Sequence, residues 1–200
     1  MDLGLSHFAT LSDASTTDNP RYYKKSEELL VRRQQILSRK TKGSNSRNRQ
    51  KNLVAKAHEK IKNQRLDFCR KLSCLLTTKY DLICIEKLDI KGMIENHSNN
   101  INLDKSIHDV GWATFIQCLK NKAENAGKTI IEVNPKNTTQ MCSGCGQLPT
   151  TKKTLRERRH CCEFCKLELD RDHNAAINIK ALGLSVAKLD REIVFSEQYN

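Results

Sequence analysis

The sequence predicts a layered α/β domain, because strand patterns alternate with helix patterns along its 200 residues. Residues 81–86 form a short apolar run that ends in Glu86, which is typical of a strand buried on both faces. Residues 129–133 form a second strand pattern. Long segments with apolar residues at helical spacing precede each of these strands. A chain of this length allows one mid-sized domain with a smaller module.

The remaining elements follow from local patterns. Residues 5–11 alternate partly between apolar and polar, which favours a half-buried strand. Residues 24–40 and a segment after the turn at 42–46 predict two long helices in a hairpin. Residues 91–106 are polar and rich in Asn, which favours a loop. Helices are expected over 109–126, ending at Gly127, and over 172–183, ending at Gly183. The predicted buried faces comprise Leu53, Ala57, Ile61, Phe68, Leu72 and Leu75 in the second hairpin helix, and Trp112, Phe115 and Leu119 in the next helix.

The charge of the chain is concentrated in one segment. The formal net charge is +12, and residues 21–71 hold 17 Lys and Arg against four Asp and Glu. Such a surplus favours a polyanionic partner, most simply nucleic acid, although charge runs are more often a solvated helix face. The aromatic share of 5% argues against single-strand binding by stacking alone. The expected nucleic-acid contacts are Arg32, Arg33, Arg39, Lys40, Lys42, Arg47, Arg49 and Lys51.

The chain shows no apolar run long enough for a transmembrane helix, so no membrane partner is expected. Its nine cysteines are an odd number, and five of them lie within residues 142–165. This distribution favours a metal site in a reducing compartment over a disulfide framework, and we expect the chain in the cytoplasm.

Two C-x-x-C pairs, Cys142 with Cys145 and Cys162 with Cys165, have the spacing of a four-thiolate zinc site. Four thiolates leave no open coordination position, so this Zn²⁺ is expected to be structural. The stretch between the pairs is expected to contribute a short strand pair. Cys161 is the rival of Cys162 but would give a C-x-x-x-C spacing, and His160 is expected to flank the site rather than bind the metal.

Three acids are candidates for a second metal site. Asp2 precedes Leu3-Gly4, where a strand is expected to turn into its neighbour, Glu86 ends the strand at 82–85, and Asp172 begins the last helix. Carboxylates at strand ends and a helix start can converge at one edge of a sheet, where they bind two Mg²⁺ or Mn²⁺ ions and hydrolyse a phosphodiester. The simpler reading of Asp172 is a helix cap.

Six motifs in this order resemble the C-terminal half of TnpB/OrfB-type proteins of insertion sequences, which are related to miniature type V CRISPR effectors. The resemblance covers most of the chain. The motifs are residues 2–13, Leu37-Ser-Arg-Lys40, Ile85-Glu-Lys-Leu88, Gly111-Trp112, Cys142-Ser-Gly-Cys-Gly146 and Asp170-Arg-Asp-His-Asn-Ala-Ala176.

The resemblance implies an RNase H-like (RuvC-like) mixed sheet with flanking helices, a long basic helical hairpin and a small zinc ribbon. It implies catalysis by Asp2, Glu86 and Asp172 with two Mg²⁺ or Mn²⁺ ions, and it favours Asp172 over Asp170. It also implies an RNA-guided DNA endonuclease of a prokaryotic cell, with DNA as substrate and a guide RNA in the full-length family protein.

The corresponding domain boundaries are 1–137 for the RuvC-like domain, with the hairpin at 21–79, 138–169 for the zinc ribbon, 170–183 for the last helix and 184–200 for a tail. The sequence begins at the first expected catalytic acid, so the first strand is expected to be short. The alternative to an active nuclease is therefore a truncated, inactive remnant that binds nucleic acid.

Overall fold

The structure, a computed structural model, describes residues 1–89, 92, 110–154 and 157–197, with side chains up to residue 188. Strands β1 (Asp2–Leu3), β2 (His7–Thr10) and β3 (Thr16–Asp18) form an antiparallel sheet. Strands β4 (Leu82–Glu86) and β5 (Thr129–Val133) pair in parallel. The backbone nitrogen of Met1 donates a hydrogen bond to the carbonyl of Cys84 over 2.8 Å, so β1 adjoins β4.

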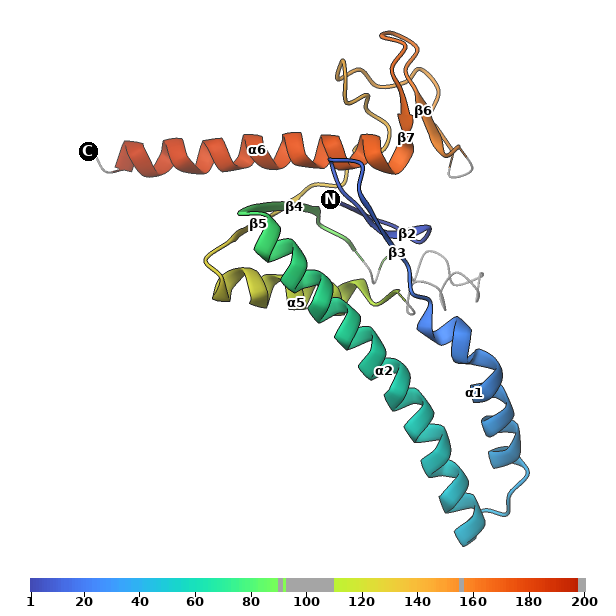
Figure 1. Cartoon of the computed structure of the whole chain (residues 1–200). Coiled ribbons are helices and arrows are strands. Elements are labelled where there is room, and N and C mark those ends of the chain that lie inside the picture. The colour runs from blue at the N-terminus through green and yellow to red at the C-terminus, as the bar shows by residue number, and fades with distance from the viewer. Residues whose placement is uncertain (90–91, 93–109, 155–156, 198–200) are drawn as a thin grey trace.

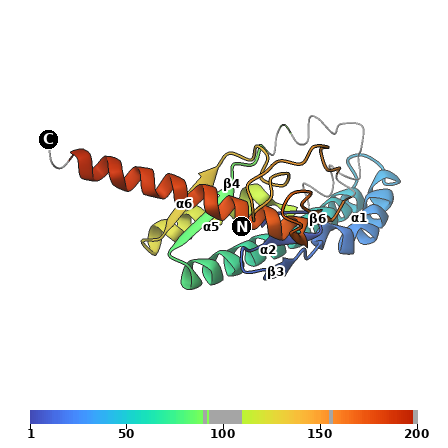
Figure 2. The same cartoon turned by 90° about the horizontal axis from the view of Figure 1, so that it is seen from above.

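In the described residues these strands are accompanied by the helices α1 (Tyr22–Ser38), α2 (Asn45–Lys79), α5 (Trp112–Asn125) and α6 (Arg171–Glu197). Helix α6 crosses one face of β4 and β5, while α2 and α5 pack on the other face (Figure 1). Seen from above, α6 extends past the end of the strands (Figure 2). This arrangement confirms the predicted mixed α/β architecture.

Strand β4 contributes to two separate cores because its side chains alternate between the two faces. Ile83 and Ile85 face α2 and α5, where they join the buried aromatic residues Phe8 and Phe115. The rings of Phe8 and Phe115 meet edge to face, with centroids 5.1 Å apart. Cys84 points the other way and packs with Ile179 of α6. The prediction that this strand is buried on both faces is confirmed.

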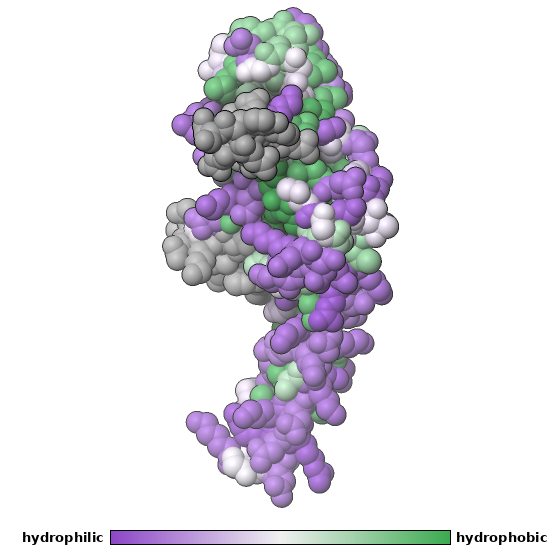
Figure 3. Space-filling view, turned by 90° about the vertical axis from the view of Figure 1, so that its left-hand side faces the viewer, coloured by the Kyte–Doolittle hydropathy of each residue, from purple (hydrophilic) through white to green (hydrophobic). Residues whose placement is uncertain are grey.

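Helix α1 and the first half of α2 form an arm that projects from the rest of the molecule (Figure 1). The buried core of the arm is small and consists of Leu30, Ala57 and Ile61. Helix α2 alone is about 50 Å long at 1.5 Å per residue. Outward-facing side chains of the arm are largely hydrophilic, as its lower part in Figure 3 shows.

The buried stripe of α2 differs from the predicted one at two positions. Leu53 and Leu75 are exposed, with exposed fractions of 45% and 63%. Leu76, four residues after Leu72, takes the core position, and Leu75 faces about 100° away from it. Gln50 and Ala57 are buried on α2, whereas Leu53, which lies between them on the same side of the helix, stays exposed. The prediction was wrong here because the repeat alone does not show which neighbouring position meets the partner helix.

Helix α6 continues through Gly183 to Glu197, so the predicted end at Gly183 is wrong. A Cβ atom at position 183 would lie 2.7 Å from the Cβ of Cys84. This glycine therefore permits close packing of α6 on β4, and it does not terminate the helix. The predicted end of the preceding helix is correct, because Gly127 has a φ of +63° just after α5.

The last two strands, β6 (Arg159–Cys161) and β7 (Glu168–Asp170), pair antiparallel near the start of α6. The short strand pair was expected between the two cysteine pairs, but β7 follows the second pair instead. The loop expected at 91–106 lies outside the described residues, Gly92 excepted. Within the described residues, no helix is both long and apolar enough to cross a bilayer.

Candidate metal centre and carboxylate site

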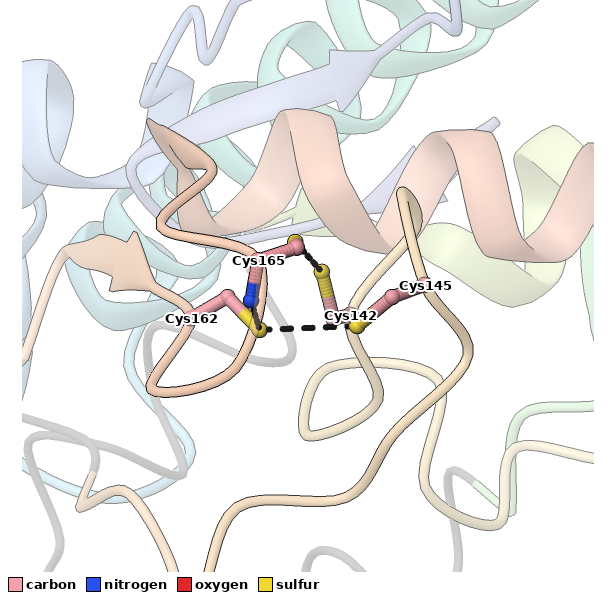
Figure 4. A group of neighbouring side chains, drawn as sticks. All are labelled: Cys142, Cys145, Cys162 and Cys165. Carbon is pink, nitrogen blue, oxygen red and sulfur yellow. Dashed lines mark hydrogen bonds between the residues drawn. The ribbon is translucent and has the colours of Figure 1, made fainter.

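The four predicted cysteine ligands lie together, with their sulfur atoms facing one another (Figure 4). The sulfur atoms of Cys142 and Cys165 are 3.6 Å apart, as are those of Cys145 and Cys162, and all four sulfurs lie within 4.8 Å of one another. Four thiolates at about 2.3 Å around a tetrahedral Zn²⁺ would be separated by about 3.8 Å. The cluster can therefore hold a metal ion such as zinc without rearrangement.

The two cysteine pairs form matched backbone turns, the first knuckle (residues 142–147) and the second knuckle (residues 162–167). In each knuckle the fifth residue donates its N–H to the carbonyl of the first: Gly146 to Cys142 and Lys166 to Cys162. Both Gly146 and Lys166 have positive φ, of 74° and 62°. This shared geometry aims both sulfurs of a pair at one point.

The thiol of Cys162 is prepared for metal binding by its own turn. The backbone N–H of Cys165 approaches its sulfur at 3.5 Å. This N–H and that of Phe164 hold the pKa of the Cys162 thiol below its ordinary value. A thiolate is the form that binds the metal.

Two residues next to the cluster, Cys161 and His160, lie outside the group of four sulfur atoms. Cys161 is exposed and lies outside the four-sulfur group. His160 is buried and its Nδ1 atom lies 2.8 Å from the Nζ of Lys153, so it supports the module without joining the group. Burial and the charge of Lys153 lower the pKa of His160.

The three acids come from three separate elements: Asp2 from β1, Glu86 from the end of β4 and Asp172 from the first turn of α6. Asp2 is buried, with an exposed fraction of 8%, whereas Glu86 and Asp172 are half-buried. Among the described residues only the cysteines form a tight group of potential metal ligands, so the acids are more loosely gathered.

The carboxylates nevertheless influence one another. The pKa of Asp2 is raised from 3.8 to about 7, mainly by burial and also by the charges of Glu86 and Asp172. The amino terminus and Arg171 oppose this shift. Burial also raises the pKa of Glu86. Buried acids that repel one another are the electrostatic condition under which a divalent cation binds favourably.

Asp170, and not Asp172, caps α6. The Asp170 carboxylate accepts hydrogen bonds from the backbone N–H groups of Asp172 and His173, at 2.8 and 3.1 Å. The Asp172 side chain lies near two guanidinium groups, 3.9 Å from Arg158 and 3.6 Å from Arg171. The reading of Asp172 as a helix cap is therefore not supported.

Three polar residues near these acids were not assigned a role from the sequence. Thr138 is buried and its hydroxyl donates a hydrogen bond to Glu86. Asn174 and Asn178 are buried on the inner face of α6. Their spacing of four residues within the apolar run around Ala175, Ala176 and Ile179 was the available indication, because amides on an apolar helix face need internal partners.

The eight basic residues expected to contact nucleic acid fall into two groups. Arg33 and Arg47 are half-buried and donate hydrogen bonds to the carbonyls of Leu53 and Leu37, both over 2.8 Å, so they join α1 to α2. The other six are exposed along the arm, namely Arg32, Arg39, Lys40, Lys42, Arg49 and Lys51.

Comparisons with known proteins show which class of protein this chain resembles. Residues 1–97 match the family model described as "Probable transposase", of the OrfB type found in IS605. Residues 112–179 match the model described as "Cas12f1-like, TNB domain". The predicted relationship to TnpB/OrfB-type proteins is thereby confirmed.

Individual relatives agree with this class. A protein of Streptomyces pristinaespiralis named "Putative RNA-guided DNA endonuclease" is 30% identical over 94% of this chain and 45% of its own length. A protein of Escherichia coli K12 with the same name and the suffix InsQ is 29% identical over 93% of this chain and 49% of its own. The chain therefore spans about half the length of these relatives.

A solved structure supports the fold. A Cas12f1 chain from a cryo-EM complex with sgRNA and target DNA superposes with a TM-score of 0.62 and 19% identity. The superposition covers 89% of this chain and 48% of the other. The two chains therefore share their architecture.

Proposed function

We propose that this chain is the phosphodiester-cleaving part of an RNA-guided DNA endonuclease, with Asp2, Glu86 and Asp172 as its catalytic acids. The observation that carries the proposal is that Asp2, buried on β1, lies close enough to Glu86 of β4 and Asp172 of α6 for their charges to raise its pKa. The names of the relatives point to the same activity.

The strand arrangement is compatible with an RNase H-like sheet. Strands β3, β2 and β1 follow in antiparallel order, β1 adjoins β4 through the Met1–Cys84 hydrogen bond, and β5 runs parallel to β4. In this arrangement β1 and β4 are central, which brings Asp2 and Glu86 side by side. Helix α6 then covers this pair and supplies Asp172.

The residues present fit two hard divalent cations, because carboxylate oxygens are the ligands that Mg²⁺ and Mn²⁺ prefer. Bound ions of this kind polarise a phosphate and lower the pKa of an attacking water. The chain's own residues supply negative charge from three rigid elements and hold the carboxylates in place. Asp2 is the least exposed of the three, so it is the acid that the fold positions most firmly.

The cysteine cluster is proposed as a zinc ribbon with a structural role. All four ligand positions are taken by sulfur atoms, so substrate has no access to the ion. The second knuckle leads directly through β7 into α6, and Asp172 lies in the first turn of that helix. The ribbon therefore supports the end of α6 that carries a catalytic acid.

The arm is proposed as a nucleic-acid surface. The six exposed residues of the predicted basic set face solvent over a long, narrow element whose surface is largely hydrophilic. Proteins of this charge pattern bind phosphate backbones. DNA is the proposed substrate, and a guide RNA is the proposed partner in the longer protein, as in the Cas12f1 complex that holds both.

Cleavage of labelled single- and double-stranded DNA with Mn²⁺ tests the proposal. Glu86→Gln and Asp172→Asn are expected to reduce the rate by at least 100-fold, because each removes a charged ligand. Asp170→Asn is the matched control, since asparagine also caps helices and cleavage should persist. Cleavage that survives both acid variants contradicts the proposal, and binding without cleavage by the unmodified chain favours the inactive alternative.

Replacing two exposed basic residues of the arm should weaken DNA binding in a salt-dependent way. For Arg32→Gln with Arg49→Gln, we expect the slope of log affinity against log salt to fall by about 0.9 for each lost duplex phosphate contact. Lys122→Gln with Lys136→Gln, which are exposed outside the arm, is the control for net charge. Fluorescence anisotropy at several salt concentrations measures the slope, and equal slopes for both pairs would exclude the arm as the binding surface.

A further inference from the structure

A short segment, residues 134–141, connects β5 to the first knuckle and contacts both Glu86 and α6 through Thr138. Thr138 lies in this segment with an exposed fraction of 2%. Its hydroxyl donates to the Glu86 carboxylate, and the carbonyl of Pro135 lies 3.1 Å away as a second acceptor. In the described part of the chain, Thr138 is the one hydrogen-bond partner of that carboxylate. The orientation of Glu86 therefore depends on where Thr138 is held.

Asn178 of α6 holds the backbone of Thr138 in place. The Nδ2 group of Asn178 donates to the carbonyls of Thr138 and Met141, both over 2.8 Å. Asn178 is itself buried, with an exposed fraction of 2%. A buried amide is costly unless it is paired, so these two bonds fix the segment against α6.

Asn174, one helical turn earlier, fixes the other end of the segment. Its Nδ2 group donates to the carbonyl of Met141 over 2.8 Å, and its Oδ1 accepts from the N–H of Ser143 over 2.9 Å. Ser143 directly follows Cys142, a ligand of the cysteine cluster. The two asparagines therefore join the first knuckle, Thr138 and α6 into one hydrogen-bonded unit.

We propose that Thr138 is a positioning residue that orients Glu86 for binding a divalent cation, and that Asn174 and Asn178 hold Thr138 in that position. This inference rests on the carboxylate site proposed above. Helix α6 then has two roles in the site: the helix carries Asp172, and the helix sets the orientation of Glu86 through Thr138. Hydrogen-bond partners that orient metal ligands typically contribute 10- to 100-fold to metal affinity.

Mn²⁺ binding to the zinc-loaded full chain, followed by electron paramagnetic resonance, tests this role. Thr138→Val removes the hydroxyl at nearly constant shape, and we expect Mn²⁺ affinity to fall about 10- to 100-fold. Thr138→Ser keeps the hydroxyl and should restore most of the affinity. Thr78→Val is the matched control, because Thr78 is exposed on α2 and its hydroxyl donates only to the carbonyl of Cys74 within the helix.

Zinc content and the urea unfolding midpoint show whether each variant is folded. Should Thr138→Val not fold, the comparison of Thr138→Ser with Asn178→Leu gives the same test, since only the latter removes the support of Thr138. If Thr138→Val keeps the Mn²⁺ affinity of the unmodified chain while Glu86→Gln loses Mn²⁺ affinity, the inference is overturned and the proposed function stands. If Glu86→Gln, introduced alone, leaves Mn²⁺ binding unchanged, the proposed function is overturned, and the inference is overturned with it.

Discussion

Asp2→Asn is expected to make the metal-free protein more stable at pH 8 while abolishing its binding of divalent cations. Asp2 is buried beside Glu86 and Asp172, and its pKa is raised to about 7. Above that pH the folded chain must hold a buried negative charge. Asparagine has nearly the same shape and no charge, so we expect the free energy of unfolding to rise by about 2 kcal/mol.

The pH dependence follows from the direction of the pKa shift. The folded state binds the Asp2 proton more tightly than the unfolded state, whose carboxyl titrates near 3.8. Stability conferred by this group is therefore present at low pH and is lost as pH rises from about 4 to about 7. The difference between Asp2→Asn and the unmodified chain should shrink as pH falls below 7. Urea unfolding at a series of pH values measures this difference in the free energy of unfolding.

Mn²⁺ should reverse the order of stability, because an ion that binds only the folded, charged site stabilises the unmodified chain and not the variant. Glu124→Gln is the control, since Glu124 is an exposed carboxyl on α5 and its loss should change little. An Asp2→Asn variant that is less stable than the unmodified chain at pH 8 without metal would show that the Asp2 carboxylate makes favourable contacts there.

Loss of one cysteine ligand is the second change with a large expected effect. Cys142→Ser should reduce bound zinc well below one ion per chain and unfold the ribbon, because structural zinc contributes about 10–16 kcal/mol of apparent binding free energy in small domains. Cys142 is also the most buried ligand and adjoins Ser143, which Asn174 binds. We therefore expect the start of α6 to become less protected in hydrogen exchange.

Cys161→Ser is the matched control for this experiment. Cys161 neighbours Cys162 in the chain but is exposed and lies outside the four-sulfur group. Zinc content and hydrogen exchange should remain those of the unmodified chain. Equal loss of zinc in Cys161→Ser and Cys142→Ser would mean that the ligand set differs from the one in the structure.

Local patterns in the sequence predicted those features that depend on neighbouring residues. The apolar run of β4, the buried face of α5 and the spacing of the two C-x-x-C pairs each define their element without long-range information. The four cysteines are gathered as predicted because each knuckle closes through hydrogen bonds between residues at most five apart. The role of Gly183 depends on Cys84, a residue about 100 positions away, and local spacing gave the wrong answer there.

The carboxylate site is predictable from the sequence only in outline. The motifs indicate Asp2, Glu86 and Asp172, but each acid has an ordinary structural alternative, and the structure shows Asp170 in the capping role once considered for Asp172. Thr138 could not be assigned, because its partner Glu86 lies 52 residues earlier and its support comes from α6. Hydrogen bonds between distant segments leave no periodic pattern in the sequence.

The central claim is that three acids from β1, β4 and α6 form one divalent-cation site. Anomalous diffraction from crystals of the zinc-loaded chain soaked in Mn²⁺ tests it most directly. We expect manganese peaks in contact with carboxylate oxygens of Asp2, Glu86 and Asp172, with two ions about 3.5–4 Å apart. Manganese peaks that avoid all three carboxylates at saturating Mn²⁺ would contradict it.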